Sequence, residues 1–289
     1  MKKQINVVSV TYNNRELLGK CVHSVMASIE FANLDGKITV VDNNSTDGTE
    51  ELMRKEFVGV NYIRNSENTG TARAFNRGIA ESGDMEYTFL MNDDVELFPE
   101  TLKEMVATLQ QYPWARGIPA NLMYADGSSQ RIKLHILGLT TPKNDKIRKA
   151  SFPGTTACLY YTEVFHHVGL FDEFYFFYNE DLDFAVRAKR RGLSFVFNPN
   201  VKVIHHKAKG RIKGERFVKP HMFAADYYYY RKNYGLLSAM LYLFLTKLRL
   251  PSYRRRYRKA QDAKQLELLE DGINKLHETV QRYRSMNGK

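Results

Sequence analysis

The first ninety residues alternate short apolar runs with helical patterns, and this alternation limits the possible folds more than any other feature. Apolar residues in 15–29 recur at helical spacing, whereas the neighbouring runs are short and typical of buried strands. The sequence predicts strands at residues 5–10, 38–41, 58–63 and 87–91, and helices at 15–29, from Thr46 or Asp47 onward, and at 71–80. Strand–helix–strand repeats of this length need right-handed crossovers between parallel strands. We therefore expect an α/β fold with a mainly parallel sheet flanked by helices.

The fourth predicted strand ends abruptly at Asn92, Asp93 and Asp94. Two adjacent carboxylates repel each other and are costly to desolvate unless a cation or hydrogen-bond donors lie against them. Mg²⁺ and Mn²⁺ prefer oxygen ligands and are often shared between carboxylates and substrate phosphates. In open α/β sheets, ligands bind outside the carboxyl ends of the strands, where this pair is expected. A metal site and a plain turn before the helix that Pro99 starts both remain compatible with these residues.

The loops after the first, second and fourth strands are expected at one edge of the sheet, because these strands run parallel. They begin with polar residues, namely Thr11, Tyr12 and Asn13, then Asp42, then Asn92, Asp93 and Asp94. Asp42 can accept hydrogen bonds from N–H or hydroxyl groups of a ligand, and Thr11 with Asn13 can line the same ligand. Segment 68–78 carries glycines that let the backbone approach a ligand. Its Arg73 suits a phosphate contact, although a solvated helix face explains an arginine there equally well.

The pattern changes from about residue 115 onward. The sequence predicts a turn at 125–128, a polar mobile loop at 138–150, a strand at 152–161, a short helix at 162–168, a helix that ends at Arg191, and strands at 193–197 and 201–204. The aromatic run 174–178 precedes the longer of these helices, and it suits either core packing or a wall against which a sugar stacks.

Bulk composition is that of a soluble globular protein, with 43% hydrophobic and 26% charged residues. A chain of 289 residues is long enough for one large α/β domain and an appendage. No signal peptide is expected at the N-terminus, because the apolar run 5–10 is short and leads straight into polar residues. Cys21 and Cys158 belong to no metal-ligand spacing, so buried reduced thiols and a cytoplasmic location are expected.

The net charge of +11 is concentrated near the C-terminus. Residues 207–259 contain 15 Lys or Arg against two acids, a charge of +13, so the rest of the chain sums to −2. The apolar part, 236–246, is shorter than the ~20 residues needed to cross a bilayer. An interfacial helix on the anionic inner face of the cell membrane fits this pattern, as does a helix docked on the catalytic domain. No motif that reads nucleic acid accompanies the charge, so nucleic acid is not an expected partner.

The last segment, 260–289, is predicted as a helix with an apolar seam. Its apolar residues recur at alternating spacings of three and four, at Leu266, Leu269, Ile273, Leu276, Val280 and Tyr283. That spacing is typical of a coiled coil, which suggests a homodimer, but a helix packed on its own chain uses the same pattern.

The motifs in this order resemble glycosyltransferase family 2. The residues that carry the resemblance are Thr11-Tyr-Asn13, Asp42-Asn-Asn-Ser-Thr-Asp-Gly, Asn68-x-Gly70 with Asn76-x-Gly78, Asn92-Asp-Asp94, Gly169-x-Phe-Asp172, Asn179-Glu-Asp181 and His205. The resemblance covers residues 4–206 and is closest to bacterial rhamnosyltransferase-like members that build surface polysaccharides. It implies an inverting enzyme with a GT-A (Rossmann-like) fold, a nucleotide-binding half at about 1–98 and an acceptor half at about 99–206.

The resemblance also implies roles for individual residues. It makes Asp42 the acid that recognises the base, and His205 a metal ligand in preference to His206. The family motif has acids at its first and third positions, and Asn92 stands at the first here, so Mg²⁺ or Mn²⁺ rests on Asp94. The residues expected to bind the nucleotide sugar are Thr11, Tyr12, Asn13, Asp42, Asn68, Gly70, Arg73, Asn76, Asn92 and Asp93.

Asp181 is expected to be the general base that takes the acceptor proton, with Glu180 as its alternative. Consecutive helical residues diverge by about 100°, so only one of the two can face the acceptor. The macrodipole also favours acids at a helix start, which is the competing structural explanation.

The expected function is inverting transfer of a sugar to a glycan or lipid-linked acceptor, with dTDP-rhamnose as the first donor and a UDP-sugar as the second. A catalytically inactive carbohydrate- or membrane-binding scaffold is the main rival, and the joint presence of Asp42, Asp94 and Asp181 argues against it. A nucleotidyltransferase is a second rival, but the chain has no Gly-rich triphosphate loop near its start.

Overall fold

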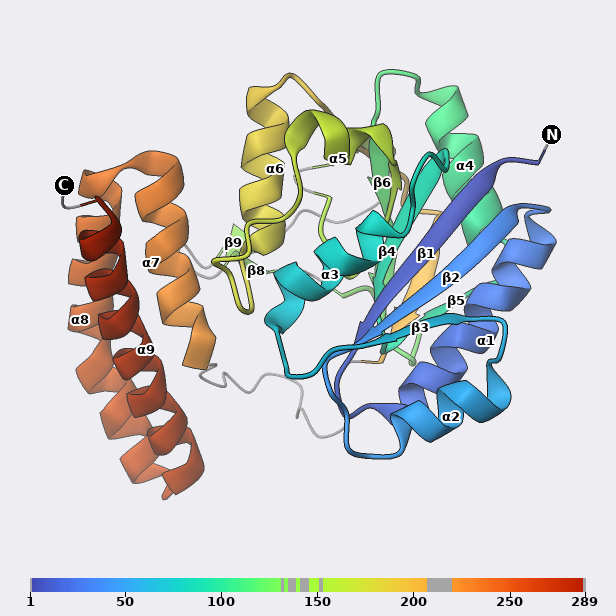
Figure 1. The fold of residues 1–289 in the computed structure, drawn as a ribbon. Helices are drawn as coiled ribbons and strands as arrows, with labels where there is room; N and C mark the ends of the chain where they lie inside the picture. The colour runs from blue at the N-terminus through green and yellow to red at the C-terminus, as the bar shows by residue number, and fades with distance from the viewer. Residues whose placement is uncertain are drawn as a thin grey trace.

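A six-stranded sheet forms the centre of the molecule in the computed structural model, which describes residues 2–130, 133–134, 139–140, 146–150, 153–206 and 220–287. Its strands, in spatial order, are β3 (Asn61–Arg64), β2 (Asp35–Asp42), β1 (Gln4–Thr11), β4 (Tyr87–Asn92), β11 (Ala157–Tyr161) and β6 (Gly117–Pro119). Only β11 runs against its neighbours β4 and β6. The prediction of a mainly parallel sheet is therefore confirmed (Figure 1).

Helices cover both faces of this sheet, because successive strand residues point to opposite faces. Val7, on one face, belongs to a hydrophobic cluster that includes residues of α1 (Arg15–Phe31), α2 (Thr49–Glu56) and α4 (Thr101–Gln111). Its neighbour Val8 packs on the other face against α3 (Gly70–Ala80), in a cluster that includes α5 (Glu163–Val168) and α6 (Glu180–Arg190). The result is a three-layer arrangement with two hydrophobic cores.

A second sheet crosses the carboxyl end of β4. It consists of β5 (Val95–Leu97), β13 (Lys202–His205) and β7 (Asn121–Met123), with β13 antiparallel to β5 and parallel to β7. His205 lies opposite Val95 in this register. The second sheet thus brings the end of β13 to the turn that holds Asp93 and Asp94.

Three predicted strands are shorter than expected. β3 begins only at Asn61, because Val58 lies in an exposed turn with 82% of its surface accessible. The strand predicted at 193–197 is reduced to β12 (Val196–Phe197), which pairs with β10 (Arg148–Lys149) inside the predicted loop 138–150. The strand predicted at 152–161 is reduced to β11, and its start at 152 lies outside the described residues, as do 138 and 141–145 of that loop. A further short hairpin joins β8 (Lys133–Leu134) to β9 (Leu139–Thr140).

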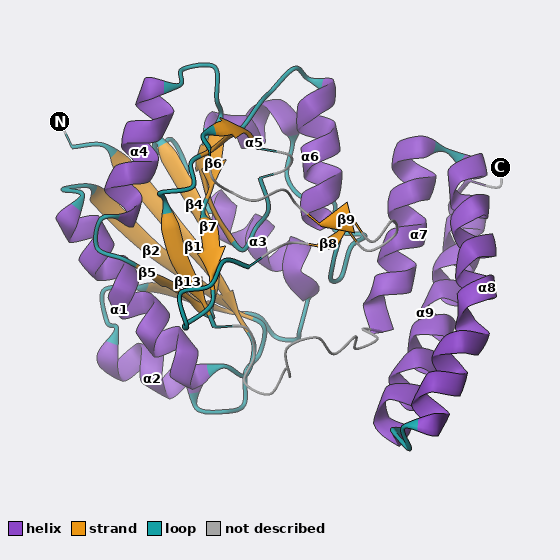
Figure 2. Cartoon of the chain, turned by 180° about the vertical axis from the view of Figure 1, so that it is seen from behind, coloured by secondary structure: helices purple, strands orange, loops and turns teal. Residues whose placement is uncertain are grey.

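The C-terminal region is a bundle of three helices, α7 (Pro220–Tyr234), α8 (Leu236–Lys259) and α9 (Ala263–Asn287) (Figure 2). Gly235, with φ of 87°, separates α7 from α8. The apolar seam of α9 packs inside the chain, where Leu269, Ile273 and Leu276 are buried against α7 and α8. That seam is not free to pair with a second copy, which removes the basis of the predicted homodimer.

The basic region 207–259 is therefore two bundle helices and a preceding segment, 207–219, that lies outside the described residues. Arg254 of α8 pairs with Glu270 of α9 at 2.7 Å, so part of the charge holds the bundle together. Across the described ranges, no helix is long and apolar enough to span a membrane.

Candidate active site

The predicted site residues of β1, β2 and β4 lie at one edge of the main sheet. Thr11 is opposite Asp42 in the register, and Val10 is opposite Asn92. Strands β1, β2 and β3 are added in one direction across the sheet, whereas β4 lies on the other side of β1. Open α/β sheets bind ligands at such a change in strand order. Thr11 Oγ1 donates to Asp93 Oδ2 across this point at 2.6 Å. Burial raises the pKa of Asp93 to about 6, against the opposing effect of that hydrogen bond.

Asp42 is fully buried, and the chain itself bonds both of its oxygens. Oδ1 accepts from the backbone N–H of Ser45 at 2.9 Å and from the Ser45 hydroxyl at 2.6 Å. Oδ2 accepts from the hydroxyl of Tyr62 on β3, whose pKa is raised by burial and by this bond. Asp42 thereby fixes the loop after β2, and because it is fully buried, a direct bond to a nucleotide base requires its surroundings to open.

In the loop after β1, Asn13 holds the backbone in place, whereas Tyr12 is exposed to solvent. Asn13 adopts a left-handed φ of 51° and accepts from the backbone N–H of Thr46 at 2.7 Å, so it joins the first loop to the second. Tyr12 leaves 51% of its surface exposed at the same edge. Of this loop, Tyr12 therefore offers the ring that a base can stack on.

The turn after β4 places Asp94 against His205. His205 Nε2 lies 3.2 Å from Asp94 Oδ1, but the two atoms lack hydrogen-bond geometry, and Asp94 Oδ1 is buried without a hydrogen-bond partner among the described residues. On the far side of the ring, His205 Nδ1 lies 2.9 Å from Gln130 Oε1.

Gln130 fixes the tautomer of this histidine. Its Nε2 donates to the carbonyl of His205 at 2.7 Å and to that of Met123 at 3.1 Å, so Oε1 must be the atom that faces Nδ1. An amide oxygen only accepts, so Nδ1 carries a proton, and Nε2 is the ring nitrogen that can present a lone pair on the side of Asp94.

This pair fits a small divalent cation. Ligand atoms at right angles around an ion with bonds of about 2.0–2.1 Å are about 2.9 Å apart, close to the separation of Nε2 and Oδ1. Within the described ranges, no group of three or more His, Cys, Asp or Glu is arranged for a metal. Two protein ligands suit an ion that takes its remaining ligands from substrate phosphates and water.

His206 has a different partner. Its Nε2 lies 2.8 Å from Glu96 Oε2, and its backbone N–H donates to the carbonyl of Asp94 at 2.8 Å. The structure therefore brings His205, and not His206, to the Asp94 carboxylate.

The start of α6 carries the two candidate base residues. Glu180 is 5% exposed, and its Oε2 has no hydrogen-bond partner in the part of the chain that is described. Asp181 is half-buried, and its Oδ1 accepts from the backbone N–H of Leu182 at 2.8 Å. Burial raises the pKa of both carboxyl groups, and the charge of Asp181 raises that of Glu180 further. A raised pKa suits a proton acceptor that works near neutral pH.

Segment 68–78 holds the loop before α6 against α3. Gly70, with φ of 80°, approaches the backbone of Phe176 so closely that a Cβ would overlap it, and Thr71 N–H donates to the Phe176 carbonyl at 2.7 Å. Asn68 Oδ1 accepts from the Gly70 N–H at 3.0 Å.

Two more of the residues predicted to bind the nucleotide sugar make hydrogen bonds or ion pairs to the loop before α6. Asn76 is buried, and its amide both donates to the Phe171 carbonyl and accepts from the Phe171 N–H at 2.9 Å. Arg73 pairs with Glu173 at 3.0 Å. These contacts are structural, and nucleotide-sugar binding by Asn68, Gly70, Arg73 and Asn76 stays a prediction.

Two residues at the site, Gln130 and Tyr62, have no signal in the sequence. They reach their partners only in the folded chain, and Gln130 is 75 positions from His205. The aromatic run 174–178 meets α7, with Phe174 stacked on Tyr228 at 3.9 Å and Phe176 on His221 at 4.6 Å between ring centroids.

Comparison with known proteins gives a family match over more than half of the chain. The model of glycosyl transferase family 2 matches residues 6–169. A Mycobacterium tuberculosis protein, N-acetylglucosaminyl-diphospho-decaprenol L-rhamnosyltransferase, is 27% identical over 242 residues, which cover 72% of this chain and 78% of that protein.

Solved structures share the fold. The Pyrobaculum calidifontis mannosyltransferase PcManGT, in complex with GDP-Man and Mn²⁺, has a TM-score of 0.57 at 14% identity and covers 96% of this chain and 87% of its own. S. aureus TarS 1–349, in complex with UDP-GlcNAc, has a TM-score of 0.58 at 14% identity, with 96% and 81% covered. The predicted GT-A fold is thereby confirmed.

Proposed function

The chain belongs to glycosyltransferase family 2, and on that premise we propose that it is a metal-dependent, inverting glycosyltransferase of surface polysaccharide synthesis. The observation that carries the proposal is the pair formed by Asp94 and His205 at the switch point of the sheet. A buried, unpaired carboxylate oxygen beside a histidine lone pair is unfavourable without a cation. An inactive scaffold has no use for such an arrangement.

The reaction follows from the Asp94–His205 pair and from the carboxyl groups at the start of α6. Asp181 takes the proton of the acceptor hydroxyl, and the oxygen attacks the anomeric carbon from the face opposite the nucleoside diphosphate. The new carbon–oxygen bond forms as the bond to the leaving phosphate breaks, which inverts the configuration. Asp94 and His205 would hold a divalent cation, which would supply Lewis-acid stabilisation of the leaving diphosphate. Thr11, Tyr12 and Asp93 border the nucleotide, and Asp42 maintains the loop beside it.

We assign dTDP-rhamnose as the first donor and a UDP-sugar as the second. The mycobacterial relative is named as an L-rhamnosyltransferase that acts on a diphospho-decaprenol, which supports both the sugar and a lipid-linked acceptor. The neighbours with GDP-Man and UDP-GlcNAc support a nucleotide sugar in general.

The experiment is a screen of nucleotide sugars for donor hydrolysis and transfer with Mg²⁺ or Mn²⁺. We expect turnover with dTDP-rhamnose, none after chelation by EDTA, and none in Asp94→Ala. Full turnover in EDTA would remove the cation from the mechanism. Turnover of a nucleoside triphosphate with release of pyrophosphate would instead favour a nucleotidyltransferase.

We further propose that α8 brings the enzyme to the anionic inner face of the cell membrane. One side of α8 exposes Leu237, Leu241, Phe244 and Leu248, with Leu237 83% and Phe244 59% accessible. The same helical spacing continues to Arg255 and Lys259, which are also exposed. An apolar stripe that continues into basic residues suits a helix lying in the lipid headgroup region.

Vesicle sedimentation tests this proposal. We expect reversible binding that favours anionic over neutral vesicles and weakens as salt rises, since each Lys or Arg near the surface contributes about 1 kcal/mol. Leu237→Asn with Phe244→Asn should release the protein, whereas Lys264→Ser on α9 serves as the charge control. Arg254 is left intact because it pairs with Glu270. Equal, negligible binding to both kinds of vesicle would leave α8 as a bundle helix only.

A further inference from the structure

Helix α6 begins directly after two residues in the left-handed region of backbone space, Tyr178 with φ of 74° and Asn179 with φ of 67°. Such a conformation is uncommon for residues other than glycine and persists where surrounding contacts hold it. Glu180 and Asp181 follow at once. The backbone of Asn179 therefore sets the direction in which both carboxyl groups point.

The side chain of Asn179 makes no cap bond to its own helix. Its Nδ2 instead donates to Asp226 Oδ1 on α7 at 2.7 Å. Tyr242 of α8 donates to the other oxygen of Asp226 at 3.3 Å. Burial raises the pKa of Asp226 to about 6, against the effect of these two bonds, so the group is ionised at pH 8. Asp226 thus joins the start of α6 to two helices of the C-terminal bundle.

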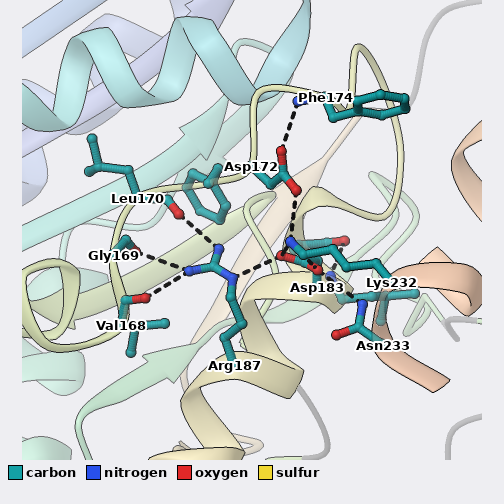
Figure 3. A network of polar contacts seen from close by, with 12 residues as sticks. Val168, Gly169, Leu170, Asp172, Phe174, Asp183, Arg187, Lys232 and Asn233 are labelled. Atoms are coloured by element: carbon teal, nitrogen blue, oxygen red, sulfur yellow. Dashed lines mark hydrogen bonds and ion pairs between the residues drawn. The ribbon is translucent and has the colours of Figure 1, made fainter. Parts of the chain in front are cut away.

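A second network holds α6 to α7 (Figure 3). Lys232 Nζ donates to Asp172 at 2.7 Å and to the fully buried Asp183 at 2.8 Å. Asn233 Nδ2 donates to Asp183 at 2.9 Å. Asp183 lies in the first turn of α6, and its backbone N–H donates to the Asn179 carbonyl at 2.9 Å. This network holds the turn to α7 at Asp183, whereas the contact between Asn179 and Asp226 holds the residue directly before Glu180.

We infer that Asp226 is a positioning residue for the general base and acts through Asn179. The inference rests on the role proposed above for Asp181. It makes the C-terminal bundle a part of the active site, because the bundle supplies the carboxylate that holds the start of α6. The residues proposed to border the nucleotide, Thr11, Tyr12 and Asp93, lie on other elements, at the ends of β1 and β4. Loss of the hydrogen bond between Asn179 and Asp226 should therefore lower kcat and leave the KM for the donor unchanged.

The experiment is a donor–acceptor exchange. Asn179→Asp puts two carboxylates against each other at pH 8, and we expect kcat to fall about 10- to 100-fold, since a displacement near 1 Å can cost that much. Adding Asp226→Asn restores one donor and one acceptor in reversed order, and kcat should return to within about threefold of wild type. Asn179→Gly keeps the left-handed backbone without strain but loses the side-chain bond, so it should slow transfer and melt near wild type.

Asn233→Ala is the matched control, because it removes side-chain bonds between the same two helices, to Asp183 at 2.9 Å and from Arg190 at 3.4 Å, and keeps the contact between Asn179 and Asp226. It should lower the melting temperature and leave kcat nearly unchanged. If both Asn179→Asp and Asn179→Gly have wild-type kcat while Asp181→Asn is inactive, the positioning role of Asp226 is wrong and Asp181 remains the proposed base. A folded double variant that stays as slow as Asn179→Asp would overturn the positioning role too. An active Asp181→Asn would instead overturn the proposed base itself.

Discussion

The carboxylates on the two sides of the site differ in how the chain satisfies them. On the nucleotide side, Asp42 accepts from Ser45 and Tyr62, and Asp93 accepts from Thr11. On the reacting side, Asp94 and Glu180 each bury an oxygen that has no hydrogen-bond partner within the described ranges. Only the first pair of carboxylates has its hydrogen bonds supplied by the protein itself.

The difference separates residues that shape the site from residues that await a ligand. A buried acceptor left unpaired costs about 1–3 kcal/mol unless a water molecule or a bound group completes it. The paired carboxylates hold the loops after β1 and β2 in place. The unpaired ones lie at the β4–β5 turn and at the start of α6, where the cation and the acceptor are proposed to bind.

The largest effect expected on the reacting side is that of Asp181→Asn. The amide keeps the shape but takes no proton, and loss of a general base typically lowers kcat by about 10²–10⁴. The KM for the donor should not change. Steady-state kinetics of this variant beside Glu180→Gln test the assignment, and an inactive Glu180→Gln with an active Asp181→Asn would exchange their roles.

The next effect concerns Gln130, which fixes His205 without touching a ligand. Gln130→Leu removes the acceptor for Nδ1–H, and such a loss beside a metal ligand typically costs about 10- to 100-fold in metal affinity. Titration with Mn²⁺ followed by electron paramagnetic resonance measures it. Glu96→Gln, which alters the neighbouring His206 pair, should bind Mn²⁺ as wild type does, and an equal loss in both would make Gln130 a general fold residue.

The pH dependence of kcat should follow the reacting side as well. Burial raises the pKa of Asp181, and only its ionised form takes a proton, so the rate falls as pH drops through that raised value. The acid limb should therefore lie above the ordinary aspartate value of about 4, with a tenfold loss per pH unit below it. A kcat profile from about pH 3.5 to pH 8 tests this, since it spans the ordinary aspartate value. A limb near pH 4 would contradict the raised pKa.

The smallest effect on activity is expected on the nucleotide side. Tyr62→Phe removes the partner of Asp42 Oδ2, so the free energy of unfolding should fall by about 1–3 kcal/mol while kcat changes little. Urea denaturation and kinetics of the same variant separate the two quantities. A large loss of kcat at unchanged stability would instead indicate that Asp42 takes part in the reaction.

The sequence predicts the fold well where strands are buried on both faces. β1 and β4 are within one residue of their predicted starts and ends because continuous apolar runs with polar ends leave little choice. The start of the third strand is predicted too early because the sequence does not show that Val58 is an exposed apolar residue and not a core residue. The seam of α9 misleads because heptad spacing does not specify whether the partner helix is on the same chain.

The candidate site is predictable only in its acids. Asp93, Asp94 and Asp181 stand in recognisable patterns, whereas Gln130 and Asp226 reach the site through contacts across 75 and 47 positions of the chain. Nothing local marks a glutamine that fixes a tautomer, because its role depends on which carbonyls its amide meets after folding.

Binding of Mn²⁺ in the presence of dTDP or UDP tests the central contrast most directly. Asp94→Asn and Asp42→Asn make the same chemical change on the two sides of the site, and melting temperatures confirm that both variants fold. The account predicts that Asp94→Asn weakens Mn²⁺ binding by about tenfold or more, whereas Asp42→Asn binds Mn²⁺ as wild type does. Equal binding by both variants, or a loss confined to Asp42→Asn, would contradict it.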